Sequence, residues 1–132
     1  QKAAEDRLRL LQAIVEQTRD AILVTEAEPV DEPGPRIVYV NPAFTQDTGY
    51  TPAEAVGRSP RFLQGPGTDR AALDKVRRAL KRWKPVRVEL LNYKKDGTEF
   101  WAELDLTPLA DASGLYTHWI AAQRDVTDRK RA

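Results

Sequence analysis

The sequence NPAFTQDTGY, residues 41–50, predicts a short helix whose start and end are both marked. Asn41-Pro42 places a capping side chain before a proline, and proline suits the first helical position because that position needs no N–H. Gly49 is typical of a helix end. Thr51-Pro52 and Ser59-Pro60 repeat the start signal, which predicts three short helices in succession. Such an irregular layer is typical of the wall of a cavity.

Strand patterns flank these helices on both sides. Apolar runs at 21–25 and 37–40 precede them, and runs at 86–93, 98–109 and 115–126 follow. The turns KKDG and ADASG carry the Asp and Gly residues that hairpins favour. A longer helix is predicted at about 69–83, with Thr68 as its cap. Its buried stripe is predicted to consist of Leu73, Val76, Leu80 and Trp83. This order of elements predicts an α+β fold, a five-stranded antiparallel sheet with short helices on one face.

The first 19 residues are predicted to form an amphipathic helix that flanks the domain. Apolar residues recur along it at helical spacing: Ala4, Leu8, Leu11 and Val15. This narrow stripe suits a partner helix or the outer face of the sheet, where Ile120 and Ala122 need cover. We therefore expect a homodimer through this helix and the outer sheet face. Residues 20–127 are predicted to form the core, and 128–132 the start of a connector to an unknown output domain.

Composition limits the classes of function. The chain has 132 residues, which indicates one domain, and its 21 basic and 20 acidic residues leave a net charge of +1. This balance argues against a nucleic-acid partner, and the basic run DKVRRALKRWK is explained by a solvated helix face. No apolar run is long enough to cross a membrane, so we predict a cytoplasmic protein without a membrane partner. The chain has no cysteine and one histidine, His118, which argues against a metal site and against an enzyme.

Polar side chains are predicted inside an otherwise apolar core. Strand alternation places Asn92 and Gln123 inward. Gln64 is expected to project from the facing helical turn, with Arg61 and Arg77 at the mouth of the same space. Three amides and two guanidiniums around an apolar cavity suit a planar heterocycle with imide groups and an anionic tail, such as flavin mononucleotide (FMN). A structural role, in which the amides satisfy loop carbonyls, is an equal alternative at this point. The predicted cavity wall consists of Thr25, Pro60, Leu63, Val76, Leu80, Leu90, Ala102, Leu104, Leu106 and Ala121.

Several segments resemble a known family. NPAFTQDTGY resembles the core signature of PAS sensory domains, and GRSPRFLQGPGTD (57–69) resembles the flavin-binding segment of their light-oxygen-voltage (LOV) branch. With LLNYKKDGTEFW and WIAAQRDVTDRK, the resemblance covers about residues 20–128. It implies a PAS fold with phosphate contacts from Arg61 and Arg77. Ring contacts are implied for Gln64, Asn92 and Gln123, which the core pattern also selects.

The sequence departs from the LOV pattern at three positions. Pro60 stands where the family has its photoreactive cysteine, Ser59 replaces the preceding asparagine, and Ala102 replaces a second ring-binding asparagine. LOV photochemistry adds a thiol to the excited flavin ring, and proline has no nucleophile, so the resemblance implies a flavin without adduct chemistry. The hydrogen bond lost at Ala102 is expected to cost about 1 kcal/mol of binding. We expect a fluorescent and photoreducible FMN, with FAD and riboflavin as alternatives.

The resemblance also implies a route for signalling. In LOV domains, the glutamine that matches Gln123 senses protonation of the flavin and passes the change to the outer sheet face. Candidate electron donors for reduction of the flavin are Trp101, Trp119, Tyr93 and Tyr116. Two alternatives stay open: a PAS domain without cofactor that acts in dimerisation and relay, and a haem-binding PAS domain. A haem domain needs an axial histidine on the 69–83 helix, which has none.

Overall fold

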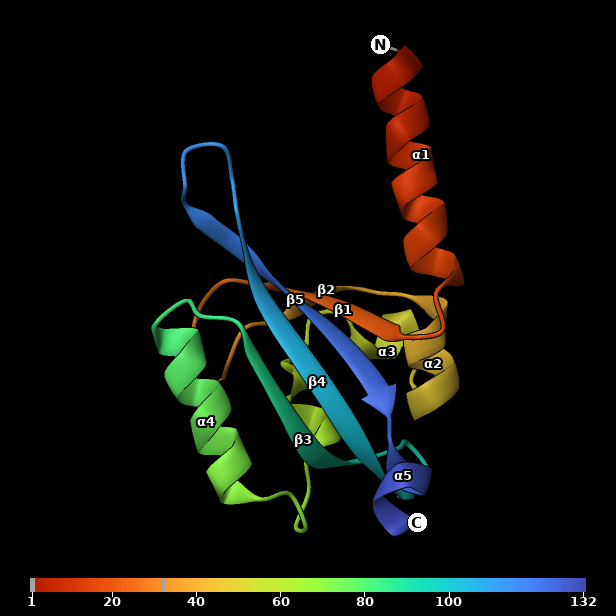
Figure 1. Ribbon diagram of the computed structural model, residues 1–132, viewed down its shortest axis with the longest axis vertical. Helices are drawn as coiled ribbons and strands as arrows, with labels where there is room; N and C mark the ends of the chain where they lie inside the picture. Colours follow the sequence, from red (N-terminus) through yellow and green to blue (C-terminus); the bar gives the residue numbers. More distant parts are fainter. Residues whose placement is uncertain (1, 32) are drawn as a thin grey trace.

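An antiparallel sheet of five strands runs through the molecule, in the spatial order β2-β1-β5-β4-β3 (Figure 1). Its strands are β1 (Ala21–Glu26), β2 (Ile37–Val40), β3 (Val86–Tyr93), β4 (Glu99–Ala110) and β5 (Tyr116–Asp125). The structure is a computed structural model that describes residues 2–31 and 33–132. The sheet confirms the predicted α+β fold, and each strand begins and ends within one residue of its expected position.

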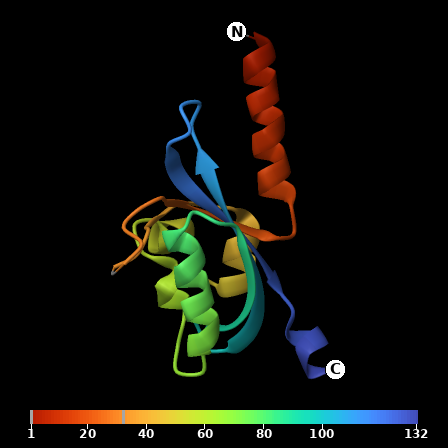
Figure 2. The ribbon, with the colours of Figure 1, turned by 60° about the vertical axis from the view of Figure 1, so that its left-hand side comes forward.

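One face of the sheet carries most of the helices. This inner face is covered by α2 (Pro42–Thr48), α3 (Pro52–Ala55), the 3-10 turn η1 (Pro60–Leu63) and α4 (Arg70–Lys81) (Figure 2). Helices α1 (Lys2–Gln17) and α5 (Thr127–Arg131) lie outside this layer, at opposite ends of the molecule (Figure 1). The opposite, outer face of the sheet is therefore largely open in the single chain, and α5 contacts it where Lys130 lies over the ring of Trp101.

Capping side chains start the short helices as the sequence predicts. Oδ1 of Asn41 accepts a hydrogen bond from the N–H of Phe44 at 3.1 Å, and Gly49 ends α2 with a φ of 83°. Thr51 and Glu54 form a reciprocal capping box at the start of α3. Because these contacts are local, they fix the entry and exit of each helix without help from the rest of the fold.

The turn η1 begins as predicted. The hydroxyl of Ser59 accepts a hydrogen bond from the N–H of Arg61 at 3.3 Å, and Gln64 caps the end of the turn. Gly65 allows close packing, since a Cβ at this position would lie 2.4 Å from Cε1 of Tyr93. The backbone after η1 therefore rests directly on an aromatic ring of β3.

The cap of α4 differs from the prediction. Asp69, not Thr68, caps this helix, and its carboxylate accepts a hydrogen bond from the N–H of Ala71. The Thr68 hydroxyl donates instead to the carbonyl oxygen of Leu91 at 2.6 Å. Both residues are good capping types, so only the tertiary contact with β3 distinguishes them.

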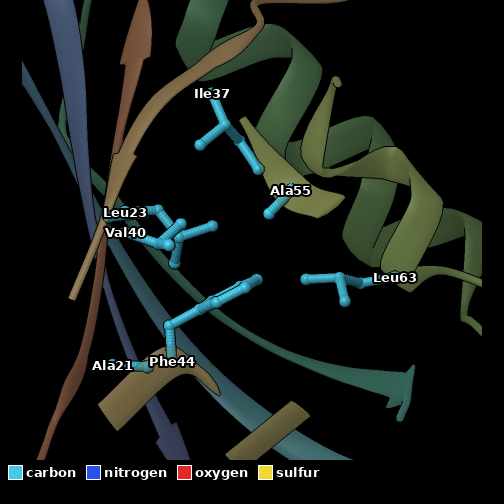
Figure 3. Packing of buried hydrophobic residues seen from close by; sticks show 8 residues of the cluster. Ala21, Leu23, Ile37, Val40, Phe44, Ala55 and Leu63 are labelled. Atoms are coloured by element: carbon cyan, nitrogen blue, oxygen red, sulfur yellow. The ribbon is translucent and has the colours of Figure 1, made fainter. Parts of the chain in front are cut away.

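An apolar cluster fills the space between the inner face and the helices α2 and α3 (Figure 3). Its members are Ala21, Leu23, Ile37, Val40, Phe44, Ala55, Leu63 and Ala121. Phe44 is fully buried, and its ring extends from α2 into the centre of the cluster (Figure 3). Burial of a side chain of this size contributes about 1.5–3 kcal/mol. The cluster therefore anchors the short helices, which are too short to be stable alone.

Helix α1 does not cover the sheet of its own chain. It projects beyond the sheet (Figure 1), and none of its described residues is buried. Leu8 and Leu11 are 67% and 54% exposed. Of the two alternatives for this stripe, cover of the helix's own sheet is therefore wrong, and cover by a partner chain stays a prediction. Over residues 2–31 and 33–132, no helix has both the length and the apolar composition that a membrane span requires.

Candidate functional site

A cavity of about 480 Å³ lies between the inner face of the sheet and the layer formed by η1 and α4. Strands β1, β3, β4 and β5 contribute its floor, while η1 and α4 contribute the facing wall. The volume falls in the usual range of small-molecule sites, about 300–1,000 Å³. The fold thus places a hollow where the sequence predicts one.

The cavity brings together nearly all of the predicted wall residues. Those that line it are Thr25, Pro60, Leu63, Val76, Leu80, Leu90, Leu104, Leu106 and Ala121. Ala102 is fully buried but is not among the lining residues. It pairs with Leu90 on one side and Asp125 on the other, inside the sheet.

Three large apolar side chains also line the cavity, although the sequence did not predict them as wall: Leu23, Leu73 and Trp119. Trp119 is 2% exposed and shares the inner face with Ala121 and Gln123. Its place therefore follows from the same strand alternation that selected Gln123. Leu73 belongs to the predicted stripe of α4, and this stripe faces the cavity rather than a filled core, so it is only half-buried.

Two buried amides contact each other on the cavity floor. Asn92 of β3 and Gln123 of β5 are 2% and 1% exposed, and Nδ2 of Asn92 donates to Oε1 of Gln123 at 3.3 Å. Within the described part of the chain, Oδ1 of Asn92 and Nε2 of Gln123 have no hydrogen-bond partner. A buried polar atom left unpaired costs about 1–3 kcal/mol. The pair therefore offers one acceptor and one donor to a molecule in the cavity.

Gln64 and the two arginines lie on the other sides of the cavity. Gln64 lines it just after η1, on the wall that faces the sheet. Arg61 and Arg77 also line it, and both contact the segment between β1 and β2. Nη2 of Arg61 donates to the carbonyl oxygen of Val30 at 2.8 Å, and Nη2 of Arg77 lies 2.6 Å from Oδ1 of Asp31.

The ion pair at the mouth is exchangeable. The side chains of Arg77 and Asp31 are 56% and 64% exposed. Exposed ion pairs of this kind contribute about 0–1 kcal/mol, because water and salt screen them. An anionic group at the mouth can therefore replace the carboxylate of Asp31 at little cost.

Known proteins share this fold. The profile of the PAS domain family matches residues 19–128. The chain belongs to the PAS domain family. The structure of a light-oxygen-voltage domain studied with a flavin analogue superposes on this PAS domain with a TM-score of 0.81 and 36% identity. That match covers 92% of this chain and 87% of the other.

Two further relatives extend the comparison. An RNA-binding light-oxygen-voltage receptor matches with a TM-score of 0.83 and 36% identity, over 92% of this chain and 34% of the receptor. A blue-light-activated histidine kinase of Brucella canis is 42% identical over 115 residues, which make up 87% of this chain. The PAS domain spans only 23% of the length of that kinase. The PAS domain of this chain is a sensory domain of the LOV type.

The turn η1 forms with proline at the position where the LOV pattern has its photoreactive cysteine. Pro60 is the first residue of η1 and lines the cavity, and Ser59 caps the turn. Proline fits because the first position of a helical turn needs no N–H. The side chain at this position of the PAS domain is therefore an apolar ring without a nucleophile.

The single histidine stands apart from the cavity. His118 lies on β5, and its Nδ1 is 2.9 Å from Oγ1 of Thr117. The helix α4, which faces the cavity, carries no histidine. Across residues 2–31 and 33–132, no group of three or more His, Asp or Glu side chains is placed to hold a metal ion. The PAS domain therefore offers a haem iron no axial ligand on α4.

Proposed function

We propose that this PAS domain binds a flavin in the cavity and senses blue light or redox state without forming a cysteinyl-flavin adduct. FMN is the form we favour, with FAD and riboflavin as alternatives, because Arg61 and Arg77 suit a terminal phosphate. The proposal draws on the LOV neighbours and on the chemistry of the lining side chains.

The observation that carries the proposal is the pair of unpaired amide atoms on the cavity floor. The pyrimidine edge of a flavin offers an N–H donor beside carbonyl acceptors. Oδ1 of Asn92 suits the donor, and Nε2 of Gln123 suits an acceptor. Gln64 supplies a third amide from the facing wall. A flavin of this orientation satisfies both buried atoms, which supports binding over a purely structural role for the amides.

The bound flavin would supply light absorption and one-electron chemistry. The protein would supply its orientation, its exclusion from water and the polarity at its ring edge. Because the chain has no cysteine and Pro60 has no nucleophile, we infer that the flavin stays fluorescent and photoreducible. Gln123, whose Nε2 is unpaired, is the residue that we propose to respond to reduction and protonation of the ring.

A spectral titration tests this function directly. Protein stripped of bound small molecules is titrated with FMN, and absorption and flavin fluorescence are recorded before and after blue light. We expect a vibronically structured blue band that bleaches slowly, or only with a reductant present. A spectrum that stays that of free FMN throughout the titration refutes the proposal and leaves a cofactor-free PAS domain that acts in dimerisation and relay.

Variants of the cavity assign the contacts. Asn92→Leu and Gln123→Leu each remove hydrogen bonds to the ring, so each is expected to weaken FMN about tenfold. Arg77→Gln is expected to weaken FMN about five- to tenfold, a value reduced for the exposure of this side chain. Riboflavin, which lacks the phosphate, is expected to bind Arg77→Gln and the unchanged protein alike. Arg78→Gln is the matched control, since this substitution removes the same charge from a side chain that does not line the cavity.

We also propose a homodimer through α1 and the outer sheet face. The support is the exposure of Leu8, Leu11 and Ile14, which is 67%, 54% and 56%. Three large apolar side chains on one helix are costly to leave in water, and a second copy of α1 covers them. Light scattering at high protein concentration tests the dimer, and Leu11→Glu is expected to shift it to monomer. A monomer in the unchanged protein contradicts the proposal.

The relatives suggest that this domain works within a longer signalling protein. In the Brucella canis kinase the matched region makes up 23% of the length, so most of that protein lies outside it. We propose that the domain acts as the sensory part of a signalling protein with an output domain, reached through α5. If Gln123 carries the signal, Gln123→Leu with FMN bound must photoreduce without any light-induced change in α5, measured by hydrogen exchange.

A further inference from the structure

Three aromatic rings form a stack that leads from the protein surface to the cavity. The ring centroids of Trp83 and Trp119 are 5.7 Å apart with planes inclined by 12°, and those of Trp83 and Tyr116 are 5.0 Å apart with 7°. Trp119 is 2% exposed and lines the cavity, whereas Tyr116 is 38% exposed. The stack therefore joins the cavity to solvent through a single intervening ring, that of Trp83.

A β-bulge brings two of these rings to the same face of β5. In a regular strand, side chains three residues apart point to opposite faces, which would separate Tyr116 from Trp119. The ladder between β4 and β5 shifts register at Leu109/Ala110, and Thr117 is the extra residue on β5. The shift reverses the alternation, so that both aromatic rings can contact Trp83.

Trp83 takes the middle position with a disfavoured backbone. Its φ is 54°, in the left-handed region that bulky residues rarely adopt. The N–H of Trp83 donates to the carbonyl oxygen of Leu80 at 3.3 Å, and the N–H of Lys84 to that of Ala79 at 3.0 Å. This pair of bonds is the Schellman motif, which glycine usually completes. The chain thus carries an indole at a position where its backbone favours glycine.

We propose that Tyr116, Trp83 and Trp119 form a one-electron relay between solvent and the cavity. The relay rests on the proposed function, because a photoexcited flavin is the oxidant that starts it. Indole and phenol rings are the side chains of this cysteine-free chain that lose an electron most readily. Stacked contact between all three makes each transfer a step between neighbouring rings.

The transfers balance in electrons and protons. Trp119 gives one electron to the photoexcited oxidant and becomes a radical cation. Trp83 then reduces Trp119, and Tyr116 reduces Trp83. Nε1 of Trp119 has no hydrogen-bond partner in the described residues, so no base there removes its proton and the charge moves on. Tyr116 loses its phenolic proton to water and becomes a neutral radical. A soluble thiolate then gives one electron to that radical, and Tyr116 takes a proton back from water. The thiyl radicals of two such turnovers combine to a disulfide.

The relay can be tested first without any flavin. One-electron oxidation of the apoprotein by azide radicals, generated by pulse radiolysis, creates tryptophan radicals whose absorption is followed in time. We expect conversion of tryptophan radical to tyrosyl radical, and loss of most of this conversion in Tyr116→Phe. Trp101→Phe is the matched control: the sequence suggested Trp101 as a donor, but it contacts Lys130 on the outer face and lies outside the stack. Unchanged conversion in Tyr116→Phe overturns the relay.

The second test uses protein shown to bind FMN, so a failure of binding is separated from a failure of the relay. Under blue light with a thiol, Trp83→Phe is expected to slow photoreduction and to abolish the transient tyrosyl signal, while Trp101→Phe leaves both unchanged. Near-ultraviolet circular dichroism of each apoprotein checks folding and reports the coupled indoles of the stack. Equal photoreduction in both variants overturns the proposal and makes the stack a packing feature only.

Discussion

The buried amide of Asn41 joins three elements and allows a quantitative test of the fold around the cavity. Asn41 is fully buried. Its Oδ1 accepts hydrogen bonds from the N–H groups of Ile22 at 2.8 Å and Phe44 at 3.1 Å, and its Nδ2 donates to the carbonyls of Val15 at 2.9 Å and Asp20 at 3.0 Å. One side chain thus connects the end of α1, the start of β1 and the start of α2.

The substitution Asn41→Ala removes all four bonds. Loss of an N-cap costs about 1 kcal/mol, and the N–H of Ile22 left unpaired costs about 1–3 kcal/mol more. We therefore expect the free energy of unfolding to fall by about 2–4 kcal/mol. Urea denaturation followed by tryptophan fluorescence measures it, at a fixed flavin concentration because ligand binding shifts stability.

The control is Thr51→Ala, which removes an exposed N-cap of the same kind. It is expected to cost about 1 kcal/mol, since water can satisfy the groups that it leaves. Hydrogen exchange should also show faster exchange at the N–H of Ile22 in Asn41→Ala and no change there in Thr51→Ala. If Asn41→Ala destabilises the protein no more than Thr51→Ala, the assignment of Asn41 as a junction between elements is wrong.

Three further substitutions test separate parts of the molecule. Gly65→Ala is expected to destabilise the fold by about 1–3 kcal/mol, because its Cβ would meet the Tyr93 ring, and Tyr93→Leu should relieve this loss in a double variant measured by thermal denaturation. Hydrogen bonding from Lys95 lowers the pKa of Glu54 from 4.5 to about 2, so Glu54 stabilises the fold above pH 4.5 and this contribution is lost as the pH falls through about 2. Glu54→Gln should therefore flatten that part of the acid denaturation profile. Pro60→Cys places a thiol on the cavity wall, and with FMN bound it should show a light-induced loss of the blue absorption band that reverses in the dark.

The fold was largely predictable because its signals are local. Asn41-Pro42 and Thr51-Pro52 each combine a cap with a proline, and two or three residues suffice to recognise them. The cap of α4 was predicted one residue too early, because Thr68 and Asp69 are equally good caps in isolation. The hydroxyl of Thr68 is drawn to a carbonyl of β3, and that contact is invisible in the local sequence.

The cavity residues on strands were predictable from side-chain alternation. Contacts between segments that are distant in the sequence were not. Asn92 and Gln123 stand out because an amide among inward apolar residues breaks a regular pattern. The contact of Arg77 with the segment between β1 and β2 depends on how that segment folds back over the mouth. The stack at Trp83 depends on a bulge in another strand and on a left-handed backbone, neither of which residue types alone predict.

In and around the turn η1, the start of the turn, its packing and the chemistry of the cavity depend on different residues. Its backbone makes no use of an N–H at the first position, so Pro60 fits there. Its packing depends on Leu63, which is buried in the core cluster, and on Gly65, which rests on the ring of Tyr93. The hydrogen-bonding atoms on the cavity floor come from other elements altogether. A change at Pro60 therefore alters the chemistry available in the cavity while leaving the support of the turn intact, which is why a LOV-type domain can lack the thiol and still keep its cavity.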